Sequence, residues 1–459
     1  MQTLTPHASA HTPLRGLNTT AMAALLTLVL LATLVRGGNR HVAMLGLEWL
    51  ALAALLAIGW GWLVGGPHAG TGSQHHHAGT PGGTTPATAW AWGLLLTAPL
   101  WLAAWAGLPV WLGWRPALAV PDATWGTALL GLPLLACLAA GRWGSDAQVS
   151  ALARAWLWVA LLQAVWGLLQ VAGLDGLRFD AASGEPAIGS FASKNTYSNL
   201  LVMALPLAAW RLAEARSQGR RQHAERTAGW HTWGGVLALL LMLSVLLLGT
   251  SRTGIATGVL VLLLALPLLL GRRNGQHDTA RPLRRRWLLA GLAALLGLAL
   301  LAAGWEWAAR FEAGRLLADD ATRALMRQTT WQAALAHWPW GSGLGSYASV
   351  YPAWQPAQFG RSLIDLAHND YLQLLMELGL AFVPLAGAVL WLLGHQLWQM
   401  WRQPAPHGHA ARNRRHLQVA AGLGLLATAL HAWVDYPFHI PANAMMACFL
   451  LGVVLRPVK

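Results

Sequence analysis

Apolar runs of about 20 residues recur along the chain, separated by short polar or basic segments. At about 1.5 Å of rise per residue, a helix of that length crosses the hydrocarbon core of a bilayer. The pattern therefore predicts an all-α polytopic membrane protein, with residues 1–459 forming a single integral-membrane domain. We expect about 12 transmembrane helices, at residues 19–36, 41–63, 88–113, 124–141, 151–172, 196–213, 232–249, 253–270, 287–304, 371–394, 417–434 and 442–455.

The longest interval without such an apolar run lies between Gly304 and Tyr371. It predicts one large loop, residues 305–370, between the ninth and tenth spans. Its charged residues carry both signs and include Glu306, Arg310, Glu312, Arg315, Asp319, Asp320, Arg323, Arg327, Arg361 and Asp365. Because this charged loop ends on His368 where a hydrophobic helix begins, we expect it to carry part of a functional site at the membrane surface.

Basic residues are distributed unevenly between alternate loops. The loops assigned to the inside collect Arg211, Arg216, Arg220, Arg221, Arg226, Arg272, Arg273, Arg281, Arg284, Arg285, Arg286, Arg402, Arg412, Arg414 and Arg415. The outside loops hold most of the carboxylates, such as Asp175, Asp180 and Glu185. The positive-inside rule therefore predicts that both termini are cytoplasmic and that residues 305–370 face the other side. No small-residue cleavage site follows the first apolar run, so we interpret it as a retained span.

The composition agrees with a membrane protein and argues against other classes. The chain is 56% hydrophobic and 10% charged, against roughly 25% charged residues in soluble domains. Its net charge of +14 lies in short runs between apolar segments, which favours retention of cytoplasmic loops over binding of nucleic acid. His75, His76 and His77 lie in a Gly- and Thr-rich loop without a carboxylate or cysteine partner, so we predict neither a metal site nor a cofactor. Cys137 and Cys448 fall inside apolar runs and imply no disulfide framework.

Four polar segments fall on the predicted outer side of the membrane. Two of them are short: residues 189–199 lead into the sixth span, and residues 251–254 connect the seventh and eighth spans. The third lies in the large loop, with GSGLGSY at residues 341–347 and HNDY at residues 368–371. The fourth, DYPFHIPAN at residues 435–443, connects the last two spans. We interpret GSGLG as a tight turn, because a Gly pattern outside a strand-to-helix turn is weak evidence for phosphate binding.

Arg252 and Lys194 are cations on the side that the orientation rule leaves poor in positive charge. Burying an arginine at a helix centre costs about 2.5–3.5 kcal/mol, so such a residue usually has a partner. One interpretation is that both side chains are interface anchors that extend to the headgroups. The other is that they bind an anion, and a lipid-linked diphosphate has the required charge.

His368 is followed by Asn369 and Asp370 at the start of a helix that also carries Glu377. Asp370 and Glu377 are seven residues apart and share one helix face. An ionisable residue inside an apolar run indicates function by default. A neutral imidazole accepts a proton, and either Asp370 or Asp435 is available to orient it. The alternative is an interface histidine with no chemical role.

These four segments, in this order, resemble the O-antigen ligase and O-antigen polymerase superfamily over about residues 185–450. The most specific parts are SRTG at residues 251–254, the large loop, and HNDYLQLLMELG from His368. The Gly-x-Phe-x-Asn-x-Asn element of the family is matched by Gly189, Phe191 and Asn195, with Ser193 in place of the first Asn. Lys194 stands where members often have a basic residue.

The resemblance implies a bacterial inner-membrane glycosyltransferase that moves a glycan from an undecaprenyl-diphosphate carrier to an acceptor in the periplasm without a metal. It implies Arg252 as a diphosphate contact, with Lys194 beside it, and His368 as the catalytic histidine. Asp370 is expected to act with His368. Supporting roles are expected for Asn195, Asn369, Glu377, Asp435 and His439, which lie in the same segments.

Two other functions compete with this prediction. A transporter or flippase for lipid-linked sugars would place its charges along a path near the middle of the membrane. A structural scaffold would leave Arg252, His368 and Glu377 without a role. The acceptor stays open between lipid A-core, a growing glycan and a protein hydroxyl, the last as in a pilin-type protein O-oligosaccharyltransferase.

Overall fold

The computed structural model describes residues 17–34, 41–64, 85–114, 131–174, 187–219, 225–249, 251–270, 313–360, 364–404, 406 and 408–457. Every regular element within these ranges is helical, and none of the described residues forms a strand. The prediction of an all-α protein is therefore confirmed for this part of the chain. The predicted ninth span, residues 287–304, and the loop with His75–His77 lie outside it.

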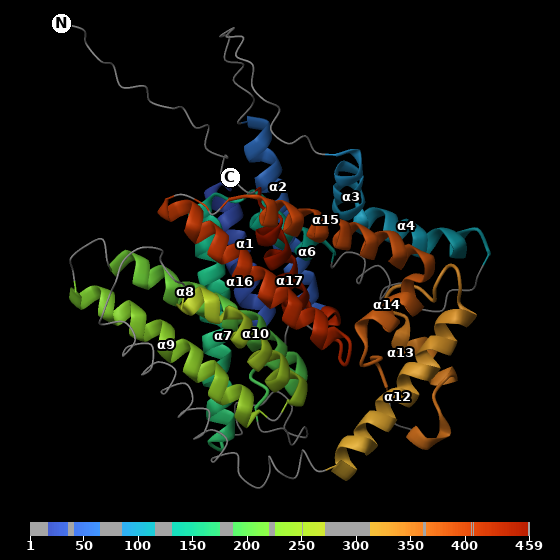
Figure 1. The fold of residues 1–459 in the computed structure, drawn as a ribbon. Coiled ribbons are helices and arrows are strands. Elements are labelled where there is room, and N and C mark those ends of the chain that lie inside the picture. The colour runs from blue at the N-terminus through green and yellow to red at the C-terminus, as the bar shows by residue number, and fades with distance from the viewer. Residues whose placement is uncertain are drawn as a thin grey trace, which may run out of the picture.

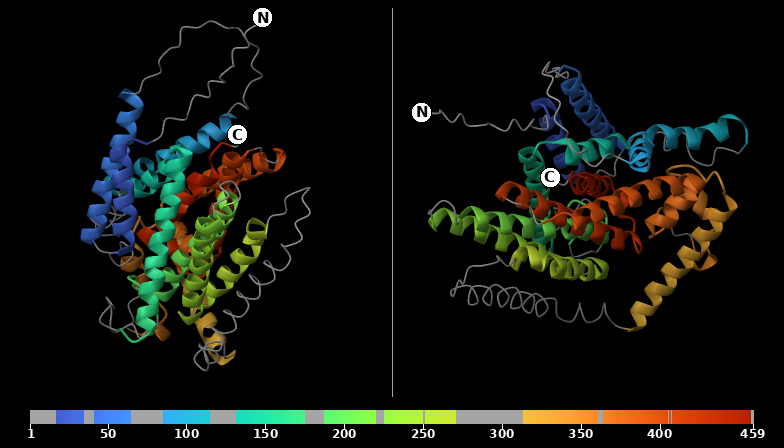
Figure 2. Two further views of the ribbon diagram at one scale, coloured as in Figure 1. Left: turned by 90° about the vertical axis from the view of Figure 1, so that its left-hand side faces the viewer. Right: turned by 45° about the horizontal axis from the view of Figure 1, so that its top comes forward.

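The N-terminal helices are α1 (Thr19–Leu34), α2 (His41–Val64), α3 (Pro86–Leu96), α4 (Ala98–Trp111), α6 (Gly131–Trp143) and α7 (Asp146–Val171). Among them, α1 and α2 pack together, α3 packs against α15 (Phe382–Arg402), and α6 packs against α17 (Pro441–Val454) (Figures 1 and 2). The predicted span over residues 88–113 coincides with a bent pair of helices, because α3 and α4 meet at Thr97 with a bend of 64°. Pro99 lies in the first turn of α4 and has no backbone N–H to continue the hydrogen-bond ladder of α3.

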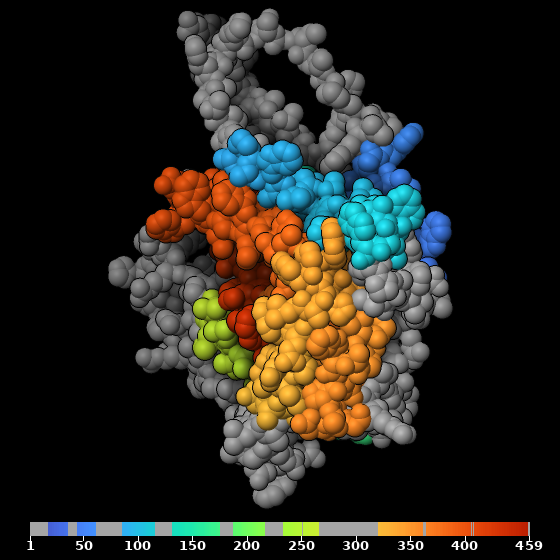
Figure 3. All heavy atoms as spheres, turned by 90° about the vertical axis from the view of Figure 1, so that its right-hand side faces the viewer, coloured from blue at the N-terminus to red at the C-terminus, as the bar shows by residue number. Residues whose placement is uncertain are grey.

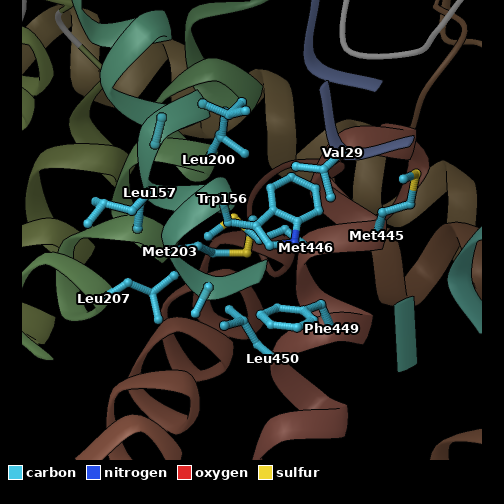
Figure 4. Packing of buried hydrophobic residues seen from close by; sticks show 14 of the residues in the cluster. Val29, Trp156, Leu157, Leu200, Met203, Leu207, Met445, Met446, Phe449 and Leu450 are labelled. Atoms are coloured by element: carbon cyan, nitrogen blue, oxygen red, sulfur yellow. The ribbon is translucent and has the colours of Figure 1, made fainter. Parts of the chain in front are cut away.

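The other half of the bundle is built around α8 (Lys194–Gly219). Its neighbours are α9 (Glu225–Leu248), α10 (Arg252–Leu270), α16 (His409–Ala432) and α17 (Pro441–Val454). Figure 4 shows Trp156 of α7 packed with Met203 of α8 and Met446 of α17, and all three are fully buried. Leu417 and Ala427 of α16 belong to the same buried cluster.

The α6 and α17 helices cross at two glycines, Gly141 and Gly452. A Cβ added at Gly141 would meet the carbonyl oxygen of Phe449, and one added at Gly452 would meet that of Leu138. Small residues at such crossings let helix backbones approach closely in lipid. The crossing holds α17 closely against α6.

Replacing Gly452 by Ala is expected to destabilise the protein by about 1–3 kcal/mol, the usual cost of forcing extra volume into a packed core. The thermal unfolding midpoint of the purified protein in detergent measures this loss. Gly422→Ala is the matched control, because the nearest atom to its added Cβ would be a Val454 methyl 3.8 Å away. Equal midpoints for the two variants would show that the crossing tolerates a methyl group.

The segment predicted as a large loop contains its own helices. They are α12 (Ala313–Ala336), α13 (Tyr347–Val350), η4 (Tyr351–Ala353) and η5 (Ala357–Phe359), and α14 (Asp370–Leu378) follows at the start of the predicted tenth span. Tyr347 and Tyr351 stack with their ring centroids 4.8 Å apart and lie in one buried cluster with Met376 of α14. Figures 1 and 3 show this group at one side of the molecule, where α12 runs across the face. The loop is thus a folded layer attached to α14.

Two described helices are long and apolar enough to cross a membrane, Asp146–Val171 and Asp370–Arg402, and the bent α3–α4 pair makes up to three. The second begins as α14, passes through η6 (Gly379–Ala381) and continues as α15 (Phe382–Arg402). Most other predicted spans coincide with shorter apolar helices, such as α1 and α17. The total of about 12 spans stays a prediction.

Candidate active site

The N-terminal ends of α8 and α10 meet through a chain of hydroxyl and amide groups. Ser251 donates a hydrogen bond from Oγ to Asn195 Oδ1 at 2.9 Å, and Ser198 Oγ donates to Ser251 Oγ at 3.0 Å. Lys194 directly precedes Asn195, and Arg252 directly follows Ser251. The structure therefore brings together the two segments that carry the predicted diphosphate-binding cations, and Asn195 is one of the contacts that join them.

The chain that leads into α8 is held by two buried glutamines of α7. Gln170 accepts hydrogen bonds from the N–H groups of Ile188 and Gly189 at 3.0 and 2.9 Å. Gln163 accepts one from the N–H of Ser190 at 3.0 Å. Gly189 has φ 55°, and a Cβ there would collide with the Gln163 side chain. These contacts explain the need for glycine and give the start of α8 a fixed position.

His368 lies between the large-loop layer and the connection from α16 to α17. Its Nδ1 is 3.3 Å from Oδ1 of Asp435, and its side chain is 33% exposed whereas that of Asp435 is 2% exposed. The ring packs edge-on against Tyr436 with the ring centroids 4.9 Å apart. Its backbone has φ 49°, in the left-handed region that non-glycine residues seldom occupy. One ring edge thus faces a buried carboxylate while the side chain keeps access to the outside.

Asn369 fixes the backbone beside His368. Its Oδ1 accepts from the N–H of Leu372 at 3.0 Å and caps α14, while its Nδ2 donates to the carbonyl of Trp433 at 3.0 Å. The side chain therefore joins the start of α14 to the end of α16.

Asp435 is the carboxylate that orients His368. Burial alone would raise the pKa of Asp435, but the adjacent His368 and the positive field of His431 and Arg323 bring it below its ordinary value. The N–H of Tyr436 donates to its Oδ1 at 3.0 Å. Its Oδ2 has no hydrogen-bond partner among the described residues. A buried carboxylate therefore faces the His368 ring.

Asp370 belongs to a second His–Asp pair. It is fully buried, its Oδ1 is paired with Nδ1 of His439, and its Oδ2 accepts from the N–H of Phe438 at 2.7 Å. The N–H of Asp370 donates to the carbonyl of Asp435 at 3.1 Å. The two segments therefore exchange partners, since each supplies one histidine and one aspartate. Of the two carboxylates available to orient His368, the geometry selects Asp435 and commits Asp370 to His439.

The imidazole of His439 carries a positive charge in this arrangement. Burial would lower the pKa of His439, but the carboxylate of Asp370 outweighs it and raises the pKa to about 10. Nε2 of the same ring lies 3.9 Å from Oε2 of Glu377. A cation between two buried carboxylates joins η7 (Pro437–His439) to α14.

The His439–Asp370 pair is expected to make the protein less stable at alkaline pH. A raised pKa means that the stabilisation is complete below the ordinary histidine value near 6.5 and is lost as pH rises through about 10. We expect the thermal midpoint of the protein to fall by several degrees between pH 8 and pH 10.5. His439→Gln should have a lower midpoint at pH 8 and a flatter dependence above it. The control His337→Gln removes an imidazole from the end of α12 and should keep the wild-type slope.

Glu377 anchors the glycine-rich turn to α14. It is 1% exposed and accepts hydrogen bonds from the N–H of Gly345 at 3.0 Å and of Tyr347 at 3.3 Å. Gln373 donates to the same carboxylate at 3.2 Å. Gly341 and Gly379 have φ of 73° and 56° where the two backbones touch. The GSGLG segment is therefore a tight turn, as predicted. The Gly345 amide donates to the Glu377 carboxylate, and the amides of Ser342 and Gly343 donate to the backbone carbonyls of Met376 and Glu377.

Sequence reasoning missed two groups that belong to this site. Arg323 of α12 acts electrostatically on Asp435 and on His431. His431 of α16 is fully buried, and neither of its ring nitrogens has a hydrogen-bond partner among the described residues. Arg323 is one of many charges in the loop, and only the packing of α12 against α14 distinguishes it. His431 lies four residues before Asp435, which is the helical spacing that could have indicated it.

Comparison with known proteins now adds a family. Residues 237–383 match the family model described as O-antigen ligase. This segment is similar to the O-antigen ligases. It contains Arg252, His368, Asp370 and Glu377, and it lies within the part of the chain where the resemblance was recognised. No curated protein was found to match the chain.

The O-antigen ligase match confirms the resemblance stated from the sequence. The family is a family of membrane proteins, and the match indicates a ligase-type glycosyltransferase. Lys194, Asp435 and His439 lie outside the matched residues, and the structure brings their segments onto the matched domain. Within the described ranges, no group of three or more His, Cys, Asp or Glu side chains has an arrangement that could hold a metal ion.

Proposed function

We propose that this O-antigen ligase-type protein transfers a glycan from an undecaprenyl-diphosphate carrier to an acceptor hydroxyl at the periplasmic face of the inner membrane. The observation that carries the proposal is the convergence of two cation-bearing segments, at Lys194 and Arg252, with the segments of the His368–Asp435 pair. The α8 segment reaches the histidine loop through the side chains of Ser193 and Tyr436, which are hydrogen-bonded. A diphosphate needs cations, and an acceptor hydroxyl needs a base.

In the proposed reaction the diphosphate of the donor lies against Arg252 and Lys194. The acceptor oxygen attacks the anomeric carbon, a C–O bond forms, and the bond from that carbon to the diphosphate oxygen breaks. The diphosphate leaves with the electron pair, and the two cations stabilise its charge. The acceptor proton passes to Nε2 of His368, because Nδ1 of that ring faces Asp435. Asp435 then stabilises the imidazolium.

Asp370 has a positioning role in this proposal. It is fully buried and paired with His439, so it does not reach a substrate. Its backbone N–H holds the carbonyl of Asp435, and its carboxylate holds the N–H of Phe438. Together with Glu377 and Asn369, it maintains the relative position of the two segments that form the His368–Asp435 pair.

The arrangement favours a transferase over a transporter or flippase. Lys194 and Arg252 lie at the first residues of α8 and α10, and His368 directly precedes the capped end of α14. A translocation path would place such charges near the middle of helices. Charges at helix ends suit a reaction at one membrane surface.

Purified protein in liposomes with a lipid-linked oligosaccharide tests the proposal. We expect glycan to appear on an added acceptor only when the donor is present, and the Arg252→Ala variant to lose the product. Lipid A-core, free glycan and a pilin peptide serve as parallel acceptors and identify the acceptor class. Movement of the intact donor across the bilayer without glycosyl transfer would support the flippase instead.

The proposed location requires a defined topology. Cysteines introduced at Ala318 and Gly275 are expected to react with a membrane-impermeant thiol reagent from the periplasmic and the cytoplasmic side, respectively, because the cation bias separates these loops. Intact cells and inverted vesicles provide the two labelling conditions. The unmodified protein, with Cys137 and Cys448 in the helical bundle, is the control. Labelling of both positions from the same side would contradict the proposed topology.

A further inference from the structure

A polar pocket lies at the end of α16 opposite to the candidate active site. It is lined by Gln403 and Pro404 after α15 and by Ala411, Arg414 and Arg415 in the first turns of α16. The 24 residues of α16 place its two ends roughly 36 Å apart at 1.5 Å per residue. That distance is about the thickness of a bilayer, so this pocket lies near the membrane surface away from His368.

Arg415 is the cation that the pocket leaves incompletely bonded. Its NH2 group donates to the carbonyl of Met400, while its buried NH1 group has no hydrogen-bond partner among the described residues. Arg414 differs, because it is paired with Asp146, which also binds Arg456. No carboxylate in the described part of the chain forms an ion pair with Arg415. Burial lowers the pKa of Arg415, which means that its charged form is disfavoured there. An anion beside the guanidinium would offset this cost.

The surrounding charge is positive. Burial lowers the pKa of His416, and the positive charges of Arg412 and His409 lower it further. Asp146 is already shared by Arg414 and Arg456. A guanidinium with free donors in such a field binds a phosphate group through charge-assisted hydrogen bonds.

The aromatic residues beside the pocket place it at the depth of lipid headgroups. Trp401 is 83% exposed and Trp398 is 47% exposed at the end of α15, and the guanidinium of Arg402 lies 4.2 Å from the Trp398 ring centroid. Tryptophans are enriched where the hydrocarbon meets the headgroups. The part of α15 that precedes these tryptophans has an apolar outer face, on which Leu397 and Leu390 are exposed. A molecule with a phosphate and an acyl chain fits this combination better than a free anion does.

We propose that this pocket binds the phosphate of an anionic phospholipid, with Arg415 as its principal contact and the acyl chains along α15. The lipid completes the hydrogen bonds of the partly buried Arg415 guanidinium and stabilises the α15–α16 connection. The proposal concerns a site at the other end of the bundle and does not depend on the reaction at His368.

The test is the thermal midpoint of the purified full-length protein in detergent with added phosphatidylglycerol, phosphatidylcholine or inorganic phosphate. We expect phosphatidylglycerol to raise the wild-type midpoint by a few degrees, since a ligand that binds the folded state stabilises it. The two other additions should leave it unchanged. Arg415→Gln should lose most of the shift, whereas Arg327→Gln, which removes a cation from α12, should keep it.

A second variant guards against a folding defect in Arg415→Gln. Ala411→Asp adds a negative charge to the pocket wall without removing a hydrogen bond, and it should also abolish the response to phosphatidylglycerol. The shared chemistry is a phosphate, so an equal shift with inorganic phosphate would overturn the lipid assignment. An undiminished shift in Ala411→Asp, or in a folded Arg415→Gln, would overturn the site itself.

Discussion

Replacing His368 by glutamine is expected to lower glycan transfer by a factor of about 10²–10⁴, which is the usual contribution of a positioned general base. Glutamine has a similar reach but cannot take a proton from the acceptor hydroxyl. Binding of the lipid-linked donor should change little, because the proposed diphosphate contacts are Arg252 and Lys194. Turnover and donor binding, measured on the same purified variant in liposomes, separate these two effects.

His395→Gln is the matched control for this substitution. His395 lies on α15, where Gln399 is its hydrogen-bond partner, and it belongs to none of the four site segments. It should keep wild-type turnover. Asp435→Asn should show a smaller loss than His368→Gln, because it removes the charge that stabilises the imidazolium but leaves the base in place. Wild-type turnover in a folded His368→Gln protein would remove His368 from the mechanism.

The pH profile distinguishes two roles for His368. As a base it must be neutral before the reaction, so activity should fall as pH is lowered and the imidazole becomes protonated. As a cation that steadies the departing diphosphate it must be charged, so activity should fall as pH is raised. Profiles should end below the pH at which the His439–Asp370 pair is lost, since that pair titrates near pH 10.

The sequence could predict where the helices that carry the site begin. The apolar runs locate the first residues of α8, α10, α14 and α17 within a few residues, because each polar segment stops where an apolar run begins. The same pattern missed the bend at Thr97, because α3 before it and α4 after it are both apolar and read as one continuous run. Apolar periodicity reports the lipid environment and says little about where a backbone bends.

The partners of the histidines could not be predicted from the sequence. His368 and Asp370 are neighbours on one segment, and Asp435 and His439 are neighbours on another. Their exchange depends on the N–H of Asp370 meeting the carbonyl of Asp435, a contact between residues far apart in the chain. Likewise, Arg323 joins the site only because α12 folds back along α14 and packs through Tyr347 and Met376. Long-range backbone contacts of this kind leave no local signal.

Arg252 carries the second large prediction, because the resemblance implies it as a diphosphate contact and its segment is firmly placed. Ser251 is buried and bonded to Asn195 and Ser198, and a Cβ at Gly254 would collide with Ser198. The backbone on both sides of Arg252 is therefore held against α8. A change of its side chain is expected to alter binding of the diphosphate without moving the helix.

Arg252→Lys is expected to lower transfer roughly 10- to 100-fold even though it keeps the positive charge. A guanidinium binds two phosphate oxygens in a planar fork, whereas an ammonium acts as a point charge, and a hydrogen bond to a charged group contributes about 1.5–3 kcal/mol. Donor binding should weaken in parallel, which distinguishes this variant from His368→Gln. Arg327→Lys on α12 is the control and should transfer glycan at the wild-type rate. Full activity of Arg252→Ala, at normal abundance in the membrane, would show that Arg252 is an interface anchor.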